Sequence, residues 1–173
     1  MTEVIRSDGI EIKKKVIQQI LLRGSGDSKF NNHINKSLKL LPPSDNLRII
    51  SNDNYTLAKM SFDQWNLIFE KEIEIKKLNK ILDDLNKSSL ILATNISDSQ
   101  VFFEIQGKNS FDILNKLTHF DLRLKKFPAF SMAQTLIAKI DCTIYNLKDK
   151  YIVTCNKSYE DYFKERLKDS IKV

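Results

Sequence analysis

The sequence is poor in several residue types on which common functional sites depend. It holds four glycines, two cysteines, two histidines and one tryptophan in 173 residues. Cys142 and Cys155 lack the C-x-x-C spacing of metal and redox motifs, and two thiols make no disulfide framework. His33 and His119 lie far apart, with no second histidine or cysteine at ligand spacing. We therefore expect no metal site and no catalytic residues in this chain.

Long apolar runs are also missing. No stretch reaches the roughly 18 residues that a membrane-spanning helix needs. The first residues, MTEVIRSDGIEIKKK, contain no apolar core of a secretory signal. We therefore expect a cytoplasmic protein without a membrane partner.

The charge balance is positive, with a net charge of +6 and a pI of about 9.2. Such a balance can indicate nucleic-acid binding. However, only five of the 28 basic residues are arginine, the side chain best suited to bidentate recognition of phosphate and guanine. The lysines are scattered among acidic residues. We expect no nucleic-acid partner, and an RNA-binding module rests on the pI alone.

Hydrophobic periodicity predicts a mixture of strands and helices in a chain long enough to bury a sizeable core. One helix follows Gly26, with Phe30, Ile34, Leu38 and Leu41 at helical spacing, and Ser25 or Asp27 as its cap. The other predicted elements are an extended segment over 11–24, a hairpin over 55–69, a helix over 71–89, a buried strand over 90–96, a strand over 101–107, a short helix over 108–117, strands over 131–155 around a turn at 148–150, and a helix over 158–171.

The order of these elements repeats. ILLRGSGDSKFNNHI and FFEIQGKNSFDIL both read strand, glycine, helix, and each is followed by a hairpin and a further helix. We therefore predict an α+β fold made of duplicated β-α-β-β-α units, with mostly antiparallel sheets and helices packed on them. Residues 1–9 are predicted to be a loose segment, and 10–173 a single compact domain with repeats at about 10–97 and 98–173.

The turn at Gly107 raises the question of a phosphate site, because phosphates often bind where a glycine links a strand to a helix. A dinucleotide fingerprint needs G-x-G-x-x-G, and a Walker loop needs G-K-[ST]. Neither occurs here, and Gly24-Ser25-Gly26 lacks its third glycine. Gly107 is better explained as the residue that lets the strand swing into the helix.

Aromatic residues supply the remaining candidates. Trp65, Tyr145 and Tyr151 could stack on a ring-shaped ligand, but aromatic side chains of hairpins more often pack in a core. The segment KKFPAFSM places Phe127, Phe130 and Met132 close together in a proline-containing connection, where polar residues are usual. We predict that these three residues form a partner interface; the alternative is that they fold back over the sheet.

Four segments occur in an order that resembles the gamma subunit of heterotetrameric sarcosine oxidase. They are LLRGSGDSKF, SFDQWNLIF, FFEIQGKNSFDIL and FPAFSMAQTLIAK, and the likeness runs from about residue 10 to the end. The residues that carry it are Arg23-Gly24, Asp63-Gln64-Trp65, Gly107, Phe127-Pro128, Ala133-Gln134-Thr135 and Ala138.

The resemblance implies a fold similar to the folate-binding domain of the glycine-cleavage T-protein. It also implies a non-catalytic, structural subunit with alpha, beta and delta subunits as partners. The whole enzyme of that family demethylates sarcosine to glycine, with hydrogen peroxide and methylenetetrahydrofolate as products. FAD, FMN, NAD and zinc are then expected in the partner subunits, tetrahydrofolate in the complex, and no cofactor in this chain.

A free-standing folate-binding protein of the T-protein type is the alternative. Such relatives carry a K-G-C-Y-x-G-Q-E motif near mid-chain. The comparable stretch here, KKFPAFSMAQT, has no Gly-Cys-Tyr and no acidic residue after Gln134. The missing motif makes the subunit the better reading of the resemblance.

Overall fold

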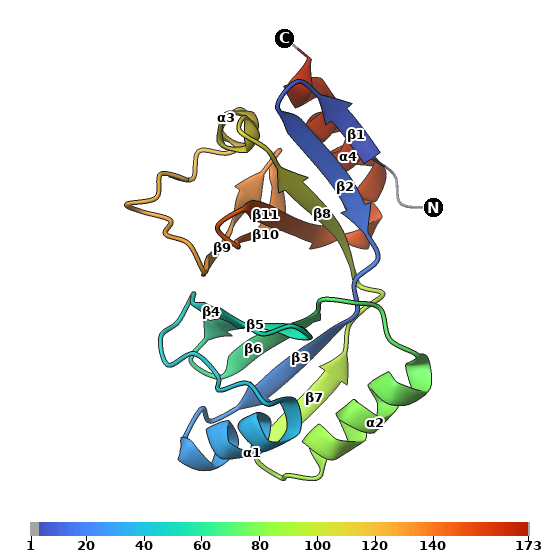
Figure 1. Ribbon diagram of the computed structural model, residues 1–173, viewed down its shortest axis with the longest axis vertical. Coiled ribbons are helices and arrows are strands. Elements are labelled where there is room, and N and C mark those ends of the chain that lie inside the picture. Colours follow the sequence, from blue (N-terminus) through green and yellow to red (C-terminus); the bar gives the residue numbers. More distant parts are fainter. Residues whose placement is uncertain (1–3, 173) are drawn as a thin grey trace. The chain divides into compact units, whose positions relative to one another are not determined.

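The computed structural model describes residues 4–172. The chain folds into two compact units. Unit 2 is Ile17–Ser97, and unit 1 combines the N-terminal residues up to Val16 with the stretch that starts at Asp98. Each unit holds one antiparallel sheet and two α-helices, which can be followed in Figure 1.

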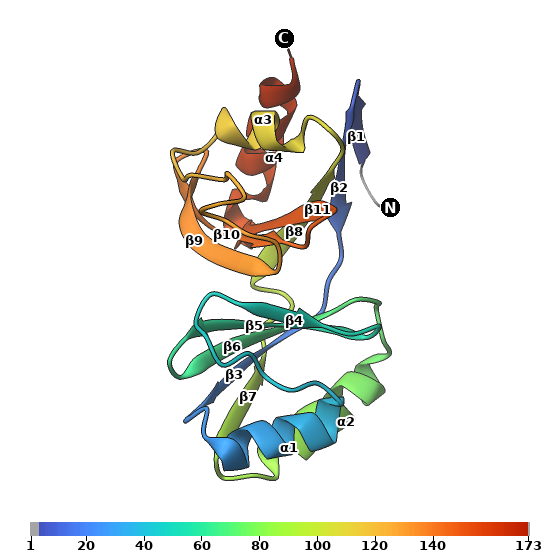
Figure 2. The same ribbon diagram turned by 60° about the vertical axis from the view of Figure 1, so that its left-hand side comes forward.

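Unit 2 has a five-stranded sheet in the order β4-β5-β6-β3-β7. Both helices cover the same face of this sheet (Figures 1 and 2). Their apolar side chains form one core with Leu22, Leu57 and Leu67 of the strands. The elements are β3 (Gln19–Gly24), α1 (Ser28–Leu38), β4 (Ile49–Ser51), β5 (Tyr55–Ser61), β6 (Gln64–Phe69), α2 (Ile75–Asn86) and β7 (Ile91–Asn95).

The predicted helix after Gly26 is confirmed as α1. The Asp27 carboxylate accepts a hydrogen bond from the Phe30 amide at 2.9 Å, which satisfies one of the amides left unpaired at a helix start. Phe30, Ile34 and Leu38 are all buried, as their spacing predicts. Leu41 is exposed instead, because Lys39 adopts a left-handed conformation (φ 55°) and ends the helix before it.

Unit 1 has a six-stranded sheet in the order β1-β2-β8-β11-β10-β9. Phe163 and Leu167 of α4 and Leu114 of α3 pack against alternate residues of the strands in one hydrophobic core. The elements are β1 (Val4–Ser7), β2 (Ile10–Lys15), β8 (Gln100–Gln106), α3 (Ser110–Asn115), β9 (Ser131–Ile137), β10 (Ile140–Asn146), β11 (Lys150–Asn156), a 3₁₀ turn (Lys157–Tyr159) and α4 (Glu160–Ile171).

The two units share one topology, which confirms the predicted α+β fold with antiparallel sheets. In unit 2 the sheet reads β4-β5-β6-β3, with β7 beside β3; in unit 1 it reads β9-β10-β11-β8, with β2 beside β8. The closing strand differs in origin, because β7 is the last strand of unit 2 in the chain, whereas β2 comes from the N-terminal segment that precedes unit 2. Unit 1 is therefore completed by the N-terminal segment.

Several predicted boundaries are corrected by the structure. Residues 4–7, expected to be loose, form β1 and pair with β2, and residues 1–3 lie outside the described residues. Each repeat has three strands after its first helix rather than the two of a hairpin. Strand β4 precedes the hairpin predicted over 55–69, and the predicted strand region 131–155 divides into β9, β10 and β11. The long helix is confined to Ile75–Asn86, and the strand predicted as buried is an edge strand with Leu92 exposed.

The predicted repeat boundary at 97/98 coincides with a boundary between units. Residues 10–16, which the prediction gave to the first repeat, belong to unit 1. The description of residues 10–173 as a single domain stays a prediction.

Gly107 is confirmed as a turn residue. Its φ is +120°, a conformation that side chains of L-residues rarely adopt. A Cβ at this position would lie 2.3 Å from the Gly9 carbonyl oxygen, the same oxygen that accepts a hydrogen bond from the Asn109 amide at the start of α3. The turn is therefore packed directly against the backbone of the β1–β2 connection.

Candidate functional site

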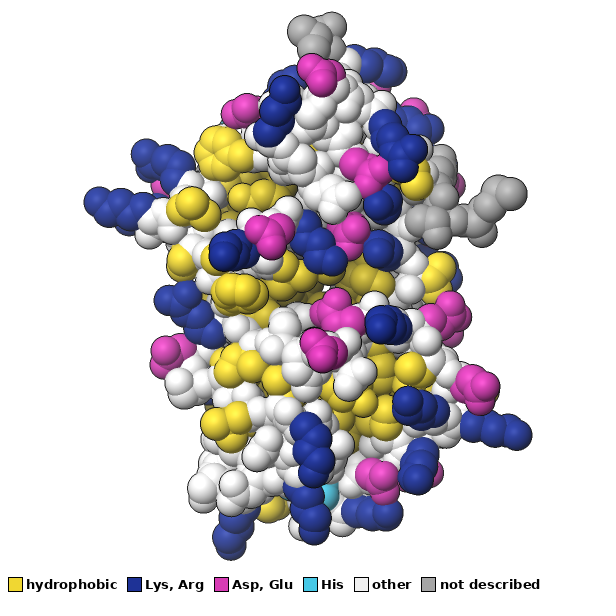
Figure 3. Space-filling view, viewed as in Figure 1, with side chains coloured by type: hydrophobic (Ala, Val, Ile, Leu, Met, Phe, Trp, Pro, Cys, Tyr) yellow, Lys and Arg dark blue, Asp and Glu magenta, His cyan; other side chains and the backbone are white. Residues whose placement is uncertain are grey.

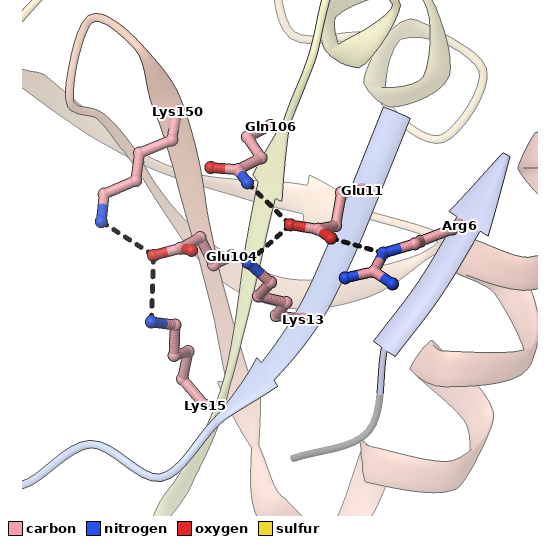
Figure 4. A network of polar contacts seen from close by, with 7 residues as sticks. All are labelled: Arg6, Glu11, Lys13, Lys15, Glu104, Gln106 and Lys150. Carbon is pink, nitrogen blue, oxygen red and sulfur yellow. Dashed lines mark hydrogen bonds and ion pairs between the residues drawn. The ribbon is translucent and has the colours of Figure 1, made fainter. Parts of the chain in front are cut away.

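The most buried charge among the described residues is Glu104, at the centre of a polar network on the sheet of unit 1 (Figure 4). Glu104 lies on β8 and is 6% exposed. Its carboxylate contacts Lys150 Nζ of β11 at 2.7 Å and Lys15 Nζ of β2 at 3.5 Å. Burial raises the pKa of Glu104, but the hydrogen bond and charge of Lys150, together with Lys15, outweigh it and leave the pKa below its usual value.

A second carboxylate, Glu11 of β2, lies beside this pair on the same side of the sheet (Figure 4). It accepts from Lys13 Nζ at 2.5 Å, Arg6 Nε at 2.6 Å and Gln106 Nε2 at 2.8 Å. The hydrogen bonds from Lys13 and then Arg6 lower the pKa of Glu11 to about 2. Both carboxylates are therefore ionised near neutral pH and bind the closing strand β2 to the sheet, which indicates a structural network rather than an acid–base pair.

The same sheet carries a hollow of about 510 Å³. The side chains of Gln134, Thr143 and Thr154 form one cross-strand row along it. Thr154 is fully buried, and its hydroxyl has no hydrogen-bond partner within residues 4–172. The other polar lining residues are Gln100, Thr135, Asp141 and Asn156, and the two cysteines also line the hollow. With its amides, hydroxyls and one carboxylate, the hollow is suited to hydrogen-bond a polar molecule.

The two cysteines, far from any motif in the sequence, are brought together by the fold. Cys142 of β10 and Cys155 of β11 are direct cross-strand partners, and both are free and buried. The hydrogen bond between the two thiols, together with burial, raises the pKa of Cys142, whereas the same hydrogen bond lowers the pKa of Cys155. The sequence already indicated this pairing, because the two cysteines lie at nearly equal distances on either side of the predicted turn at 148–150.

The predicted interface residues are not equivalent. Phe127 and Met132 are each 2% exposed, and Phe127 packs edge-on against Phe120 at 5.2 Å and parallel to Tyr151 at 6.5 Å. Phe130 alone is exposed, at 45%, with its backbone in the left-handed region (φ 58°). Phe127 and Met132 therefore fit the alternative, in which the segment folds back over the sheet. The partner interface stays a prediction, and among the three residues only Phe130 could contact a partner without unfolding of the segment.

The aromatic candidates for ligand stacking are mainly core residues. Trp65 and Tyr145 are each 1% exposed, and Trp65 contacts the Phe30 ring at 4.5 Å. The indole N–H of Trp65 is buried, with no hydrogen-bond partner among the residues that the structure describes. Tyr151 is half-buried on Phe127, and burial raises the pKa of its hydroxyl.

The histidines do not meet. His33 contacts the Asp84 carbonyl oxygen at 3.1 Å in unit 2, and His119 is exposed in unit 1. Over residues 4–172, no three His, Cys, Asp or Glu side chains gather in a group that could hold a metal ion. Over the same range, no helix is both long and apolar enough to cross a bilayer.

Basic side chains are dispersed. On the face drawn in Figure 3, lysines and arginines alternate with aspartates and glutamates. Ion pairs also form between near neighbours in the chain, among them Lys87 with Asp84 and Arg123 with Asp121, each at 2.6 Å. That face shows no continuous basic stripe of the kind that tracks a nucleic-acid backbone.

The fold defines a class of duplicated α+β proteins. The structure is similar to aminomethyltransferase T of the glycine cleavage system from Bartonella henselae, with a TM-score of 0.62 and 13% identity over 88% of this chain and 43% of that chain. It is also similar to a chain of the heterotetrameric sarcosine oxidase from Corynebacterium sp. U-96, solved with pyrrole 2-carboxylate. That match has a TM-score of 0.83 and 15% identity, over 98% of this chain and 87% of that chain.

The family model of the sarcosine oxidase gamma subunit (SoxG) matches residues 23–172. The chain therefore belongs to the sarcosine oxidase gamma subunit family, which confirms the resemblance found in the sequence. No curated protein sequence matches the chain.

Proposed function

We propose that this chain is the non-catalytic gamma subunit of a heterotetrameric sarcosine oxidase and acts in the assembly of that complex. Its partners are the alpha, beta and delta subunits. FAD, FMN, NAD and zinc belong to those partners, and tetrahydrofolate is a substrate of the complex. The observation that carries the proposal is the family match over residues 23–172.

Two further observations support the proposal. The fold follows a chain of a heterotetrameric sarcosine oxidase over nearly the full length of both proteins. In addition, three large apolar side chains of the stretch from Leu124 to Leu136 are exposed. Leu124 (69%) and Phe130 (45%) lie in the connection between α3 and β9, where polar groups normally face the water, and Leu136 (56%) lies on the edge strand β9. Exposed apolar groups of this kind are expected where a partner subunit binds.

The test is assembly with and without this chain. The alpha, beta and delta subunits are expressed from the same source with the gamma chain, and in parallel without it. We expect a four-subunit complex by size-exclusion chromatography, and peroxide from sarcosine, only when the chain is present. The chain alone is expected to show no flavin absorbance and no peroxide. Full activity of the three other subunits without it, or turnover by the isolated chain, would overturn the proposal.

A free-standing folate-binding protein is the second candidate, and the polar hollow beside Thr154 is the observation that favours it. Titration of the isolated chain with tetrahydrofolate, followed by calorimetry, separates the two. Binding that is lost in Thr154→Val and retained in Leu92→Ala, a change on the other unit, would support this second function. Absence of binding to a chain that assembles normally supports the subunit.

A further inference from the structure

The position of the cysteine pair within the β10–β11 hairpin follows from its hydrogen bonds. The Leu147 amide donates to the Lys150 carbonyl at 2.9 Å, so these two residues form a hydrogen-bonded pair. Hydrogen-bonded and non-hydrogen-bonded pairs alternate along an antiparallel ladder. Counting outward through the register of the two strands, Cys142 and Cys155 fall on a non-hydrogen-bonded pair.

The other side of β11 gives the same result. The Lys157 amide donates to the Ser99 carbonyl at 3.0 Å, which makes that pair hydrogen-bonded. Two residues back along the strand, Cys155 is then hydrogen-bonded to Val101 of β8. Because each residue of a central strand directs its backbone groups to one neighbour only, those of Cys155 point away from Cys142.

This position suits a disulfide. In a non-hydrogen-bonded pair the Cα atoms are about 4.5 Å apart and the side chains approach most closely. Disulfides span Cα separations of roughly 4.4 to 6.8 Å, so the bond needs no displacement of the strands. The two side chains point to the same face of the sheet, and their thiols already contact each other.

The surroundings select the oxidant. Cys142 is 4% exposed and Cys155 is 2% exposed, within the core formed by Ile137, Ile144 and Phe163. Both residues also line the polar hollow, but so little of either side chain is exposed that a charged, bulky disulfide such as oxidised glutathione has poorer access to the sulfur atoms. Hydrogen peroxide is small and uncharged, so it reaches them more easily.

We propose that Cys142 and Cys155 form a redox-active dithiol that hydrogen peroxide closes to an intramolecular disulfide. The Cys155 sulfur attacks one peroxide oxygen; the S–O bond forms, the O–O bond breaks, and the departing hydroxide leaves as water with the thiol proton. The Cys142 sulfur then attacks Cys155; the S–S bond forms, the S–O bond breaks, and a second water leaves. Two thiols and one peroxide thus give one disulfide and two waters, and a thiol reductant reverses the change.

Cys155 takes the first step because it receives the hydrogen bond from the neighbouring thiol, which lowers its pKa and raises its thiolate fraction. The Cys142 proton is shared between Cys155 and the Ile137 carbonyl oxygen, 3.9 Å from its sulfur. Cys142 is therefore the resolving residue. The two positions are not interchangeable, and single substitutions reveal the order.

The experiment uses the reduced, folded chain and hydrogen peroxide. We expect the free thiols, counted after denaturation, to fall from two to none, with a loss of two hydrogen masses and a peptide map that links Cys142 to Cys155. Dithiothreitol restores both thiols, and oxidised glutathione at the same concentration gives the product at least about tenfold more slowly. Cys142→Ser is expected to trap a dimedone-reactive sulfenic acid on Cys155, and Cys155→Ser to react about tenfold more slowly with peroxide.

The wild-type peptide map decides the proposal even if a serine variant fails to fold. Thiols that survive peroxide, sulfinic acids in place of the link, or only intermolecular disulfides would each overturn the dithiol. Equal rates for the two folded variants would overturn the assigned order. None of these outcomes bears on assembly with other subunits, so the inference stands apart from the proposed function.

Discussion

The stretch from Phe127 to Phe130 offers a test that separates folding from assembly. Both residues were predicted to bind a partner, but the structure buries Phe127 and exposes Phe130. The perturbation is the same truncation at each position, Phe127→Ala and Phe130→Ala. The two variants should therefore differ in kind rather than in degree.

The expected magnitudes follow from the side-chain environments. Phe127 is 2% exposed between the rings of Phe120 and Tyr151, and its carbonyl oxygen accepts from the buried Asn146 side chain at 2.9 Å. Truncation of a buried phenylalanine lowers the free energy of unfolding by about 3–5 kcal/mol. Phe130 leaves 45% of its surface in water and lies outside the core cluster, so its truncation should change stability by no more than about 0.5 kcal/mol.

The assay has two parts. Urea unfolding of each isolated variant, followed by far-ultraviolet circular dichroism, gives the free energy of unfolding. Binding to the immobilised alpha, beta and delta subunits then gives the change in affinity. We expect Phe130→Ala to weaken binding by about 2 kcal/mol if it is an aromatic anchor. Phe62→Ala is the matched control, since it is the same truncation of an exposed phenylalanine (77%) that lies in unit 2.

Two results would refute this reasoning. A Phe127→Ala chain with an unchanged unfolding midpoint would show that its ring contacts contribute nothing to the fold. A Phe130→Ala chain that binds as tightly as the Phe62→Ala control would remove the last of the predicted interface residues.

Three further predictions concern stability. Trp65→Ala should lower the free energy of unfolding by about 3–5 kcal/mol by calorimetry, because the ring is buried on Phe30; an unchanged melting temperature would contradict its place in the core. Gly107→Ala should cost about 1–3 kcal/mol from the positive φ alone, and more from the collision with Gly9, whereas Lys108→Ala should be neutral in the same urea titration. Glu104→Gln should cost about 1–3 kcal/mol at pH 7. Folding lowers the pKa of Glu104, so the stability that its carboxylate contributes is present above the pKa of the unfolded chain and is lost as pH falls through the pKa of the folded chain. On acidification, Glu104→Gln should therefore lose less stability than wild type. Parallel pH profiles of the two proteins would contradict the ion pair.

Elements whose signals are local could be predicted from the sequence. Helix α1 is indicated by Phe30, Ile34 and Leu38 at helical spacing behind an aspartate cap, and the structure has all of these features. The hairpin of β5 and β6 likewise follows from two apolar runs around a short polar turn. In both the helix and the hairpin, the residues that determine the structure lie close together in the sequence.

The turn between β9 and β10 could not be predicted, because its residues give no signal. Ala138 and Lys139 both adopt left-handed conformations, with φ of 53° and 67°. Hairpin turns of this kind usually contain asparagine or glycine. Here Ala138 is held in place from outside, since its amide donates to the Leu117 carbonyl at 2.8 Å and its carbonyl accepts from the Tyr162 hydroxyl at 2.9 Å. Tertiary contacts set a conformation that the local sequence disfavours.

The candidate site was missed for a related reason. Glu104 and Lys150 pair across two strands of unit 1, and Lys15 reaches them from the N-terminal strand β2. The sequence of a strand does not indicate which distant strand it will pair with. The origin of the closing strand could therefore not be predicted from the sequence. In the structure, where β2 is paired with β8, the charges of this strand have specific partners, with Lys13 on Glu11 and Lys15 on Glu104. The charge pattern of residues 10–15 is therefore explained by ion pairing, because this strand joins β8 and its neighbours, which come from the second half of the chain.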